Sequence, residues 1–147
     1  MVFTIPGEPR GKQRPRYSRK TGIIYTPSET TGYEMKVQHD YLIQGGKKIP
    51  PTHMLHTADR DVEIATAVKV EIWAFLEPPK SVPIWEKILM VGDFIFPTKK
   101  PDIDNIGKIV LDALNGAAWK DDAAVVDLTV HKRYGDVPRV VVQIDEV

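Results

Sequence analysis

Hydrophobic and polar positions alternate in several stretches of the chain, and this alternation predicts β-strands. The strongest signal covers residues 67–76, where apolar residues occupy every second position. Residues 125–134 and 139–144 alternate in the same way, on either side of a Gly-Asp-Val-Pro turn. Residues 2–5 and 23–26 are shorter candidates. The pattern therefore predicts a sheet of four or five strands.

Two other segments repeat apolar residues at helical spacing. In residues 29–44, tyrosine and valine recur every four positions, and Ser28 stands where a helix N-cap is expected. Residues 102–115 carry a longer apolar stripe and are followed by Gly116, which suits the position after a helix C-cap. A weaker helical pattern covers residues 82–90. Two or three helices are therefore expected to pack on the sheet.

The segments between these elements are expected to be loops. Proline and glycine interrupt the basic stretch that ends at Gly22. Residues 47–61 are rich in proline, histidine and aspartate and have no period. We therefore predict a single α/β (α+β) domain over residues 1–147, in which a mixed β-sheet of four or five strands packs with two or three helices.

Composition narrows the class of protein. A chain of 147 residues, 42% of them hydrophobic, has the size and apolar content of one globular domain. The absence of cysteine excludes disulfides, thiolate metal sites and redox switches. No apolar run approaches the roughly 20 residues of a membrane span, and the first residues do not resemble a signal peptide. We expect a cytoplasmic protein with no membrane partner.

Charge is balanced overall but segregated along the chain. The net charge is zero, with 20 basic and 20 acidic residues, which argues against nonspecific coating of DNA. One stretch nevertheless holds six basic residues and no acidic one, namely Arg10, Lys12, Arg14, Arg16, Arg19 and Lys20. A second basic pair, Lys99-Lys100, directly precedes Asp102 and Asp104. This arrangement suggests a polyanionic substrate held over a metal site.

The aspartates that begin the helix predicted after Pro101 have two interpretations. Pro101 disfavours helix at the residue before it, so Asp102 falls near the N-cap and Asp104 in the first turn. Carboxylates are stabilised there by free N–H groups and the helix dipole, so such an aspartate is more often a cap than a ligand. Asp104, Lys108 and Asp112 also share one helix face, which fits either an exposed salt-bridged surface or a functional one.

A second acidic pair, Asp121-Asp122, lies in the short connection between this helix and the next predicted strand. Adjacent like charges are unfavourable unless a cation or a basic group neutralises them. The connection returns the pair toward the sheet, and packing decides whether it meets the start of the helix. Carboxylates are ligands that Mg²⁺ and Mn²⁺ prefer, and the four histidines share no ligand spacing that would favour zinc.

Three motifs follow one another at fixed spacing, most specifically across residues 101–127. They are Lys-Pro-Asp-Ile-Asp-Asn-Ile-Gly-Lys, then Leu-Asp-Ala-Leu-Asn-Gly, then Trp-Lys-Asp-Asp-Ala-Ala-Val-Val. Together they closely resemble the RusA family of Holliday-junction resolvases, which are typically encoded by phages or prophages. The N-terminal Gly-Glu-Pro-Arg-Gly-Lys-Gln-Arg-Pro-Arg resembles the opening of many members. Residues 46–61 have no counterpart and inherit no role.

The resemblance implies a set of site residues and an assembly. The three metal-binding aspartates and the assisting lysine of the family fall on Asp102, Asp104, Asp122 and Lys108. Asp112 and Asp121 also match family positions, and we expect supporting roles for them. The resemblance further implies a homodimer with two active sites, because a junction is resolved by paired nicks in opposed strands.

These observations predict a structure-selective endodeoxyribonuclease that resolves four-way DNA junctions in recombination and repair by paired Mg²⁺-dependent hydrolysis. Mn²⁺ is expected to substitute for Mg²⁺, and no nucleotide cofactor is expected. Phosphate contacts are expected from Arg10, Lys12, Arg14, Arg16, Lys99 and Lys100. Without the resemblance, the basic stretch fits a solvated loop equally well. Two rival functions stay open, a catalytically inactive protein that binds branched DNA and a flap or replication-fork nuclease.

The position of a dimer interface is also open. The apolar residues least explained by the predicted core are Trp73, Phe75, Leu76, Trp85, Ile88 and Leu89. Such residues belong more often to an ordinary core than to an interface. They are the sequence's candidates for subunit contacts.

Overall fold

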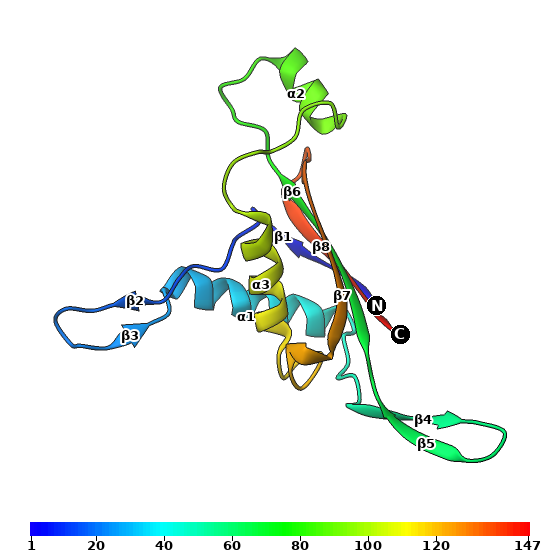
Figure 1. The fold of residues 1–147 in the computed structure, drawn as a ribbon. Coiled ribbons are helices and arrows are strands. Elements are labelled where there is room, and N and C mark those ends of the chain that lie inside the picture. The colour runs from blue at the N-terminus through cyan, green and yellow to red at the C-terminus, as the bar shows by residue number, and fades with distance from the viewer.

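A four-stranded mixed sheet forms the centre of the fold in the computed structural model, which describes residues 1–147 (Figure 1). Its strands are β1 (Val2–Pro6), β6 (Val68–Leu76), β7 (Val125–Tyr134) and β8 (Arg139–Glu146). They lie in the order β1-β8-β6-β7, with β6 parallel to β7 and the other neighbours antiparallel. The mixed sheet and the α+β class predicted from the alternation are confirmed.

Every second residue of β6 is buried, because the helices cover one face of this strand. Its alternate residues from Val68 to Ala74 are inaccessible to solvent on the face that the helices cover. Both edges of β6 are paired, so the two strands predicted on either side of the Gly-Asp-Val-Pro turn flank β6 and do not pair with each other. Gly135, directly after β7, crosses the end of β6 and donates its N–H to the Leu76 carbonyl at 2.9 Å.

Two helices, α1 (Ser28–Ile43) and α3 (Ile103–Leu114), cover one face of this sheet (Figure 1). α1 packs against β1, α3 packs against β7, and the two helices contact each other. The main hydrophobic core lies between the helices and the sheet. It includes Trp119, whose indole N–H donates to Asn115 Oδ1 at 2.9 Å and so satisfies the one polar atom that this large side chain buries.

The third helix, α2 (Ile84–Val91), lies beyond the end of β6 and away from the other two (Figure 1). A small separate core of Leu76, Met90 and Tyr134 joins it to the sheet. No helix of the structure combines the length and the apolar character that crossing a membrane requires.

Two small hairpins project from this body (Figure 1). One pairs β2 (Arg16–Tyr17) with β3 (Ile24–Tyr25), and the other pairs β4 (Thr52–His56) with β5 (Asp61–Ala65). The prediction of a loop over residues 47–61 is therefore wrong where β4 and β5 form. The residues of these two strands are largely exposed. In β5 the apolar Val62 and Ile64 do alternate with Asp61 and Glu63, but the run is only five residues long.

The observed ends of α3 agree with those predicted from the sequence, whereas the start of α1 differs from the prediction. Asp102 is the N-cap residue of α3, and Gly116 follows its C-cap with a φ of 80°, both as predicted. The N-cap of α1 is Pro27 and not Ser28. The helical hydrogen bonds begin at the Pro27 carbonyl, which accepts from the N–H groups of Thr30 and Thr31, so Ser28 is already inside the helix.

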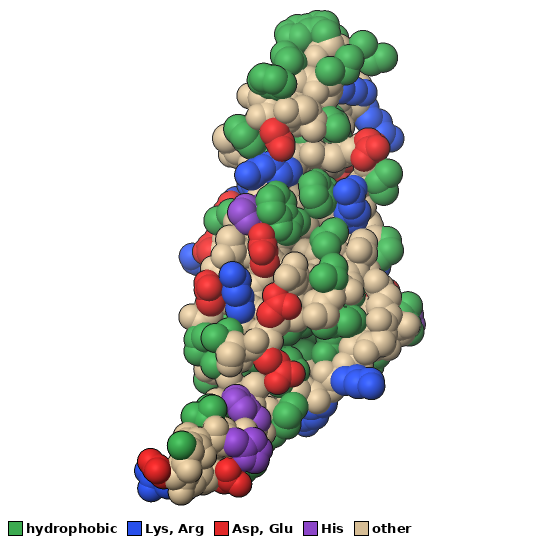
Figure 2. All heavy atoms as spheres, turned by 90° about the vertical axis from the view of Figure 1, so that its right-hand side faces the viewer, with side chains coloured by type: hydrophobic (Ala, Val, Ile, Leu, Met, Phe, Trp, Pro, Cys, Tyr) green, Lys and Arg blue, Asp and Glu red, His purple; other side chains and the backbone are tan.

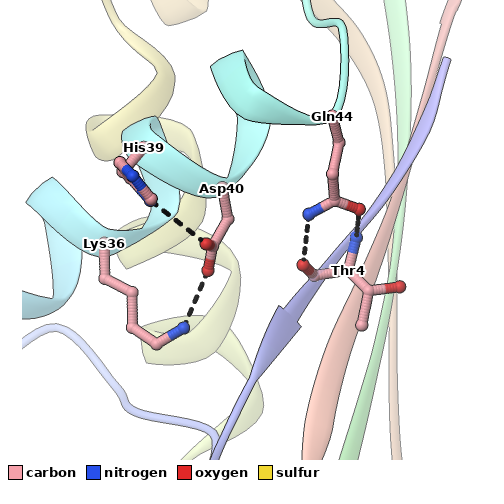
Figure 3. A network of polar contacts seen from close by, with 5 residues as sticks. All are labelled: Thr4, Lys36, His39, Asp40 and Gln44. Atoms are coloured by element: carbon pink, nitrogen blue, oxygen red, sulfur yellow. Dashed lines mark hydrogen bonds and ion pairs between the residues drawn. The ribbon is translucent and has the colours of Figure 1, made fainter.

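Polar side chains fix α1 on the edge of the sheet (Figure 3). Gln44 accepts from the Thr4 N–H at 2.9 Å and donates to the Thr4 carbonyl at 2.7 Å, which satisfies backbone groups of the edge strand β1. On the helix itself, the buried carboxylate of Asp40 lies 2.7 Å from Lys36 Nζ and 3.4 Å from His39 Nδ1. The Gln44 contacts tie the end of α1 to β1, whereas the Asp40 contacts lie within the helix.

Candidate active site

The first turn of α3 carries two carboxylates that the helix does not use. Asp102 occupies the N-cap position, but its side chain makes no capping hydrogen bond. It instead accepts from Lys100 Nζ at 2.6 Å. Asp104 follows in the first turn with an exposed side chain. Capping therefore does not account for the Asp102 carboxylate, whose partner is the exposed ammonium of Lys100.

Asp102 and Asp104 open into the same surface pocket, which has a volume of about 630 Å³. Its lining combines carboxylates with amines and consists of Thr98, Lys99, Lys100, Asp102, Ile103, Asp104 and Lys132. The structure thus brings the predicted Lys99-Lys100 pair together with the first two predicted ligands. A pocket with both signs of charge can hold a cation and a phosphate together.

Lys132 on β7 supports this pocket and was missed in the sequence. Its ammonium donates to the backbone carbonyls of Lys99 and Pro101, which fixes the segment before α3. Burial lowers the pKa of Lys132 more than the nearby Asp102 carboxylate raises it. The available signal was its place in the alternation of β7, where a lysine stands between Val130 and Tyr134 on the side that faces the helix.

The basic N-terminal segment runs across the start of α3. The Lys12 N–H donates to the Asn105 carbonyl at 2.8 Å. Gly11 is packed so closely that a Cβ there would lie 3.1 Å from the Cβ atoms of both Asn105 and Pro101. A hollow of about 540 Å³ lies between residues 8–13 and the start of α3. The basic N-terminal segment and Lys100 therefore border one hollow at the start of α3, and Lys100 also lines the carboxylate pocket.

The predicted phosphate-contacting residues differ in how free their charges are. Arg14, Arg16 and Lys99 are exposed and make no ion pair, and Arg10 makes only a surface contact of 3.8 Å with Glu29. Lys100 is also exposed but pairs with Asp102 at 2.6 Å. Lys12 is different, because its ammonium pairs with Glu34 of α1 and, at 3.0 Å, with Asp112 of α3. Burial lowers the pKa of Lys12, but the hydrogen bonds and charges of these carboxylates outweigh it and raise the pKa overall.

The remaining carboxylates gather at the other end of α3. Asp121 caps the short 3₁₀ turn η1 (Asp122–Ala124) by accepting from the Ala123 N–H at 2.9 Å. Partial burial, followed by the neighbouring carboxylates of Asp121 and Asp112, raises the pKa of Asp122. The structure therefore places Asp122 in an acidic group with Asp112 and Asp121, which Lys12 borders.

The predicted metal ligands do not all lie together. Asp112 follows Asp104 by eight residues, which is about 12 Å along the axis of α3. Asp122 lies at the Asp112 end, away from the pocket of Asp102 and Asp104. No three histidine, aspartate or glutamate side chains are placed so that they could hold a metal ion. The assignment of Asp102, Asp104 and Asp122 as ligands stays a prediction.

Lys108 lies between the two acidic groups on the exposed side of α3. The alternative role considered for it, an ion pair with Asp104 one turn earlier, is not formed, because no ion pair in the structure involves Lys108. Its ammonium is therefore free for another partner.

Comparison with known protein families matches residues 6–145 to the family described as Endodeoxyribonuclease RusA. The chain belongs to the RusA family. The resemblance seen in the motifs is thereby confirmed, and the match includes both acidic groups and the basic segment. The chain is also 35% identical to "Uncharacterized protein YqaN" of Bacillus subtilis (strain 168), over 99% of this chain and 95% of that protein. RusA membership implies endodeoxyribonuclease activity.

Lys12 of this RusA chain is expected to contribute to stability more than to DNA contact. Replacing it by methionine leaves Glu34 and Asp112 facing each other without a cation, beside Asp121 and Asp122. We expect the free energy of unfolding to fall by about 1–3 kcal/mol, the range for a half-buried charged group that loses its partner. Urea unfolding followed by circular dichroism measures this change.

Lys20→Met is the matched control, because Lys20 is an exposed lysine of the same basic segment without an ion-pair partner. Its unfolding midpoint is expected to equal that of the unmodified protein. Equal midpoints for Lys12→Met and Lys20→Met would show that the ion-pair network adds nothing to stability.

Proposed function

We propose that this RusA-family protein is a structure-selective endodeoxyribonuclease that resolves four-way DNA junctions by paired, Mg²⁺-dependent phosphodiester hydrolysis. The observation that carries the proposal is the pocket at the start of α3. Two carboxylates unused by the helix open there beside Lys99 and Lys100, where the basic segment crosses. A phosphate of DNA bound along the basic segment would lie next to oxygen ligands for a metal ion.

The donor set of this pocket fits Mg²⁺. That ion is bound by one or two carboxylates and completes its shell with waters and substrate phosphate oxygens. Asp102 and Asp104 supply two such carboxylates, and Mn²⁺ accepts the same ligands. We propose Asp122 as the third ligand on the family motif. When bound, the ion would polarise the scissile phosphate and lower the pKa of an attacking water.

The lysines of the site have separate roles in this proposal. Lys132 holds the segment before α3 by its bonds to backbone carbonyls, which sets the position of Asp102. Lys99 and Lys100 border the pocket and bind the phosphates that flank the scissile bond. Lys108, which has no protein partner, stabilises the negative charge that develops on the phosphate oxygens.

Cleavage of defined substrates tests the function. A synthetic four-way junction, a replication fork, a flap and a linear duplex are incubated with the protein, with and without Mg²⁺, and the products are separated on a denaturing gel. We expect paired nicks at symmetric positions of the junction only with the metal. Preferred cutting of the flap or the fork would support that rival function, and tight junction binding without any cutting would support the inactive binding protein.

We also propose that the protein acts as a homodimer through the segment around α2. Trp85 and Ile88 are 62% and 67% exposed, and hydrophobic side chains gather over this end of the molecule (Figure 2). Leu76, by contrast, lies in the small core, and Trp73 and Phe75 stack beside each other on the open face of the sheet. A symmetric dimer would place two equivalent sites on the two-fold symmetric junction.

The dimer proposal predicts an effect of charge on α2. Replacing both Trp85 and Ile88 by glutamate is expected to give a monomer, since the contact would then bury unpaired charges. Ile43→Glu is the control, because Ile43 is similarly exposed, at 65%, on a different helix. Sedimentation equilibrium over a wide concentration range measures the mass. An unmodified protein that stays one subunit at micromolar concentration, resolves junctions fully and does not pair on DNA contradicts the proposal.

A further inference from the structure

The hairpin of β2 and β3, with the turn between them, forms a projecting arm over residues 16–25 (Figure 1). Only two residue pairs form its ladder, Arg16 opposite Tyr25 and Tyr17 opposite Ile24. The turn is closed by the Ser18 N–H donating to the Ile23 carbonyl at 2.9 Å. An isolated two-stranded hairpin is at best marginally stable in water, so this arm is expected to gain stability from a partner.

The arm exposes large apolar side chains on both of its faces. Tyr17 and Ile24 are cross-strand partners and point to the same side, and they are 64% and 70% exposed. Tyr25 and Ile23 are exposed as well. All four residues of the two short strands are exposed, so neither face packs on the rest of the protein. Contiguous exposed apolar surface of this kind marks an interaction site.

Charge shows which partner suits this surface. Residues 9–28, which include the whole arm, contain six basic residues and no acidic one. Two arms in a symmetric contact would bring these charges together, so a second copy of the chain is disfavoured. The segment that leads into the arm packs on the start of α3 through Gly11 and Lys12, near the pocket of Asp102 and Asp104. DNA bound at that pocket, as proposed above, would therefore be the nearest partner of opposite charge.

Phosphates alone do not explain the apolar residues, because phosphates need only the arginines and lysines. Apolar and aromatic side chains instead pack on the faces of bases. In a linear duplex those faces are covered by stacking, whereas at a branch point the stack is interrupted. We propose that the arm packs Tyr17 and Ile24 against bases at the branch point, while its basic residues hold the flanking phosphates. This inference rests on the proposed action at branched DNA.

The test separates the apolar contacts of the arm from its charges. A four-way junction with 2-aminopurine at the branch point reports base unstacking by increased fluorescence. A linear duplex with the same labelled strand is the comparison. Binding is measured without divalent cation so that no cutting occurs. The double variant Tyr17→Ala with Ile24→Ala removes the apolar pair, and Arg19→Ala with Lys20→Ala removes two charges from the same arm as the matched control.

We expect the apolar variant to lose the fluorescence increase and to bind the junction roughly ten-fold or more weakly, with little change on the duplex. Its salt dependence of binding should stay the same. The charge variant should keep the fluorescence increase but bind both DNAs more weakly with a shallower salt dependence. The inference is overturned if the unmodified protein binds the junction without raising the fluorescence. It is also overturned if the apolar variant binds the junction and raises the fluorescence as much as the unmodified protein does.

A lower sedimentation mass of the apolar variant without DNA would assign the arm to a subunit contact and would also overturn the inference. The proposed function fails separately. A protein that unstacks branch-point bases through Tyr17 and Ile24 but cuts no four-way junction refutes junction resolution and leaves the role of the arm intact. Normal junction cutting by the apolar variant, with an unchanged fluorescence increase, refutes the proposed role of the arm and leaves junction resolution intact.

Discussion

Replacing Asp102 or Asp104 by asparagine is expected to abolish junction cutting and to leave junction binding in place. The amide keeps the shape of the side chain but loses the charge that would hold the metal. Metal stabilisation of a phosphoryl transition state is worth several kcal/mol, so cutting should fall by roughly 1,000-fold or more. Gel-shift and cleavage assays on the same protein preparations measure both quantities.

Asp122→Asn belongs to the same experiment and is its most informative part. Asp122 lies with Asp112 and Asp121 in the structure, so loss of cutting in this variant would show that the two acidic groups act together once DNA and metal are bound. Asp59→Asn is the control, because Asp59 is exposed in the turn between β4 and β5. A variant that retains near-normal Mg²⁺-dependent cutting removes its aspartate from the site.

Replacing Arg14 and Arg16 together by alanine is expected to weaken DNA binding far more than the cutting of bound DNA. Both side chains are exposed in the basic segment. Each lost phosphate contact lowers the slope of log K against log salt by about 0.9, so the two should weaken binding roughly 30-fold near 0.15 M salt. Fluorescence anisotropy across a salt series measures the slope, and single-turnover cleavage measures the rate.

Arg60→Ala is the matched control for this prediction. Arg60 is equally exposed but lies in the turn between β4 and β5, away from the carboxylate pocket. Its salt slope is expected to match that of the unmodified protein. An unchanged slope in the Arg14 and Arg16 variant would mean that the basic segment is only a solvated loop.

The sequence predicted those elements that bury one face. Apolar residues recur at every second position of β6 and form a stripe along α3, because the sheet and the helix each bury one face against the other. Both elements therefore lie where they were predicted. The hairpin of β4 and β5 was not predicted, because it buries little and only β5, with Val62 and Ile64, alternates over a short run. The order of the strands was also beyond the sequence, because pairing of β6 with both β7 and β8 joins segments far apart in the chain.

In the candidate site, too, the positions set by neighbouring residues in the sequence were predicted, and the positions set by packing of distant segments were not. The place of Asp102 at the start of α3 follows from Pro101 and the stripe behind it, and it was predicted. The burial of Lys12 between Glu34 and Asp112 depends on how α1 and α3 pack together, and no local pattern reveals it. The position of Asp122 depends in the same way on the path of η1 after α3.

The pairing of β1 with β8 sets an order for assembly during synthesis. Val2 lies opposite Gln143, so the pairing of β1 cannot be completed until the residues up to Gln143 have left the ribosome. Until then its buried side chains can be sheltered only by earlier segments. Phe3 meets Tyr41 edge to face at 5.2 Å, and Gln44 binds the backbone of Thr4. α1 can therefore hold the N-terminal strand in place for its late partner.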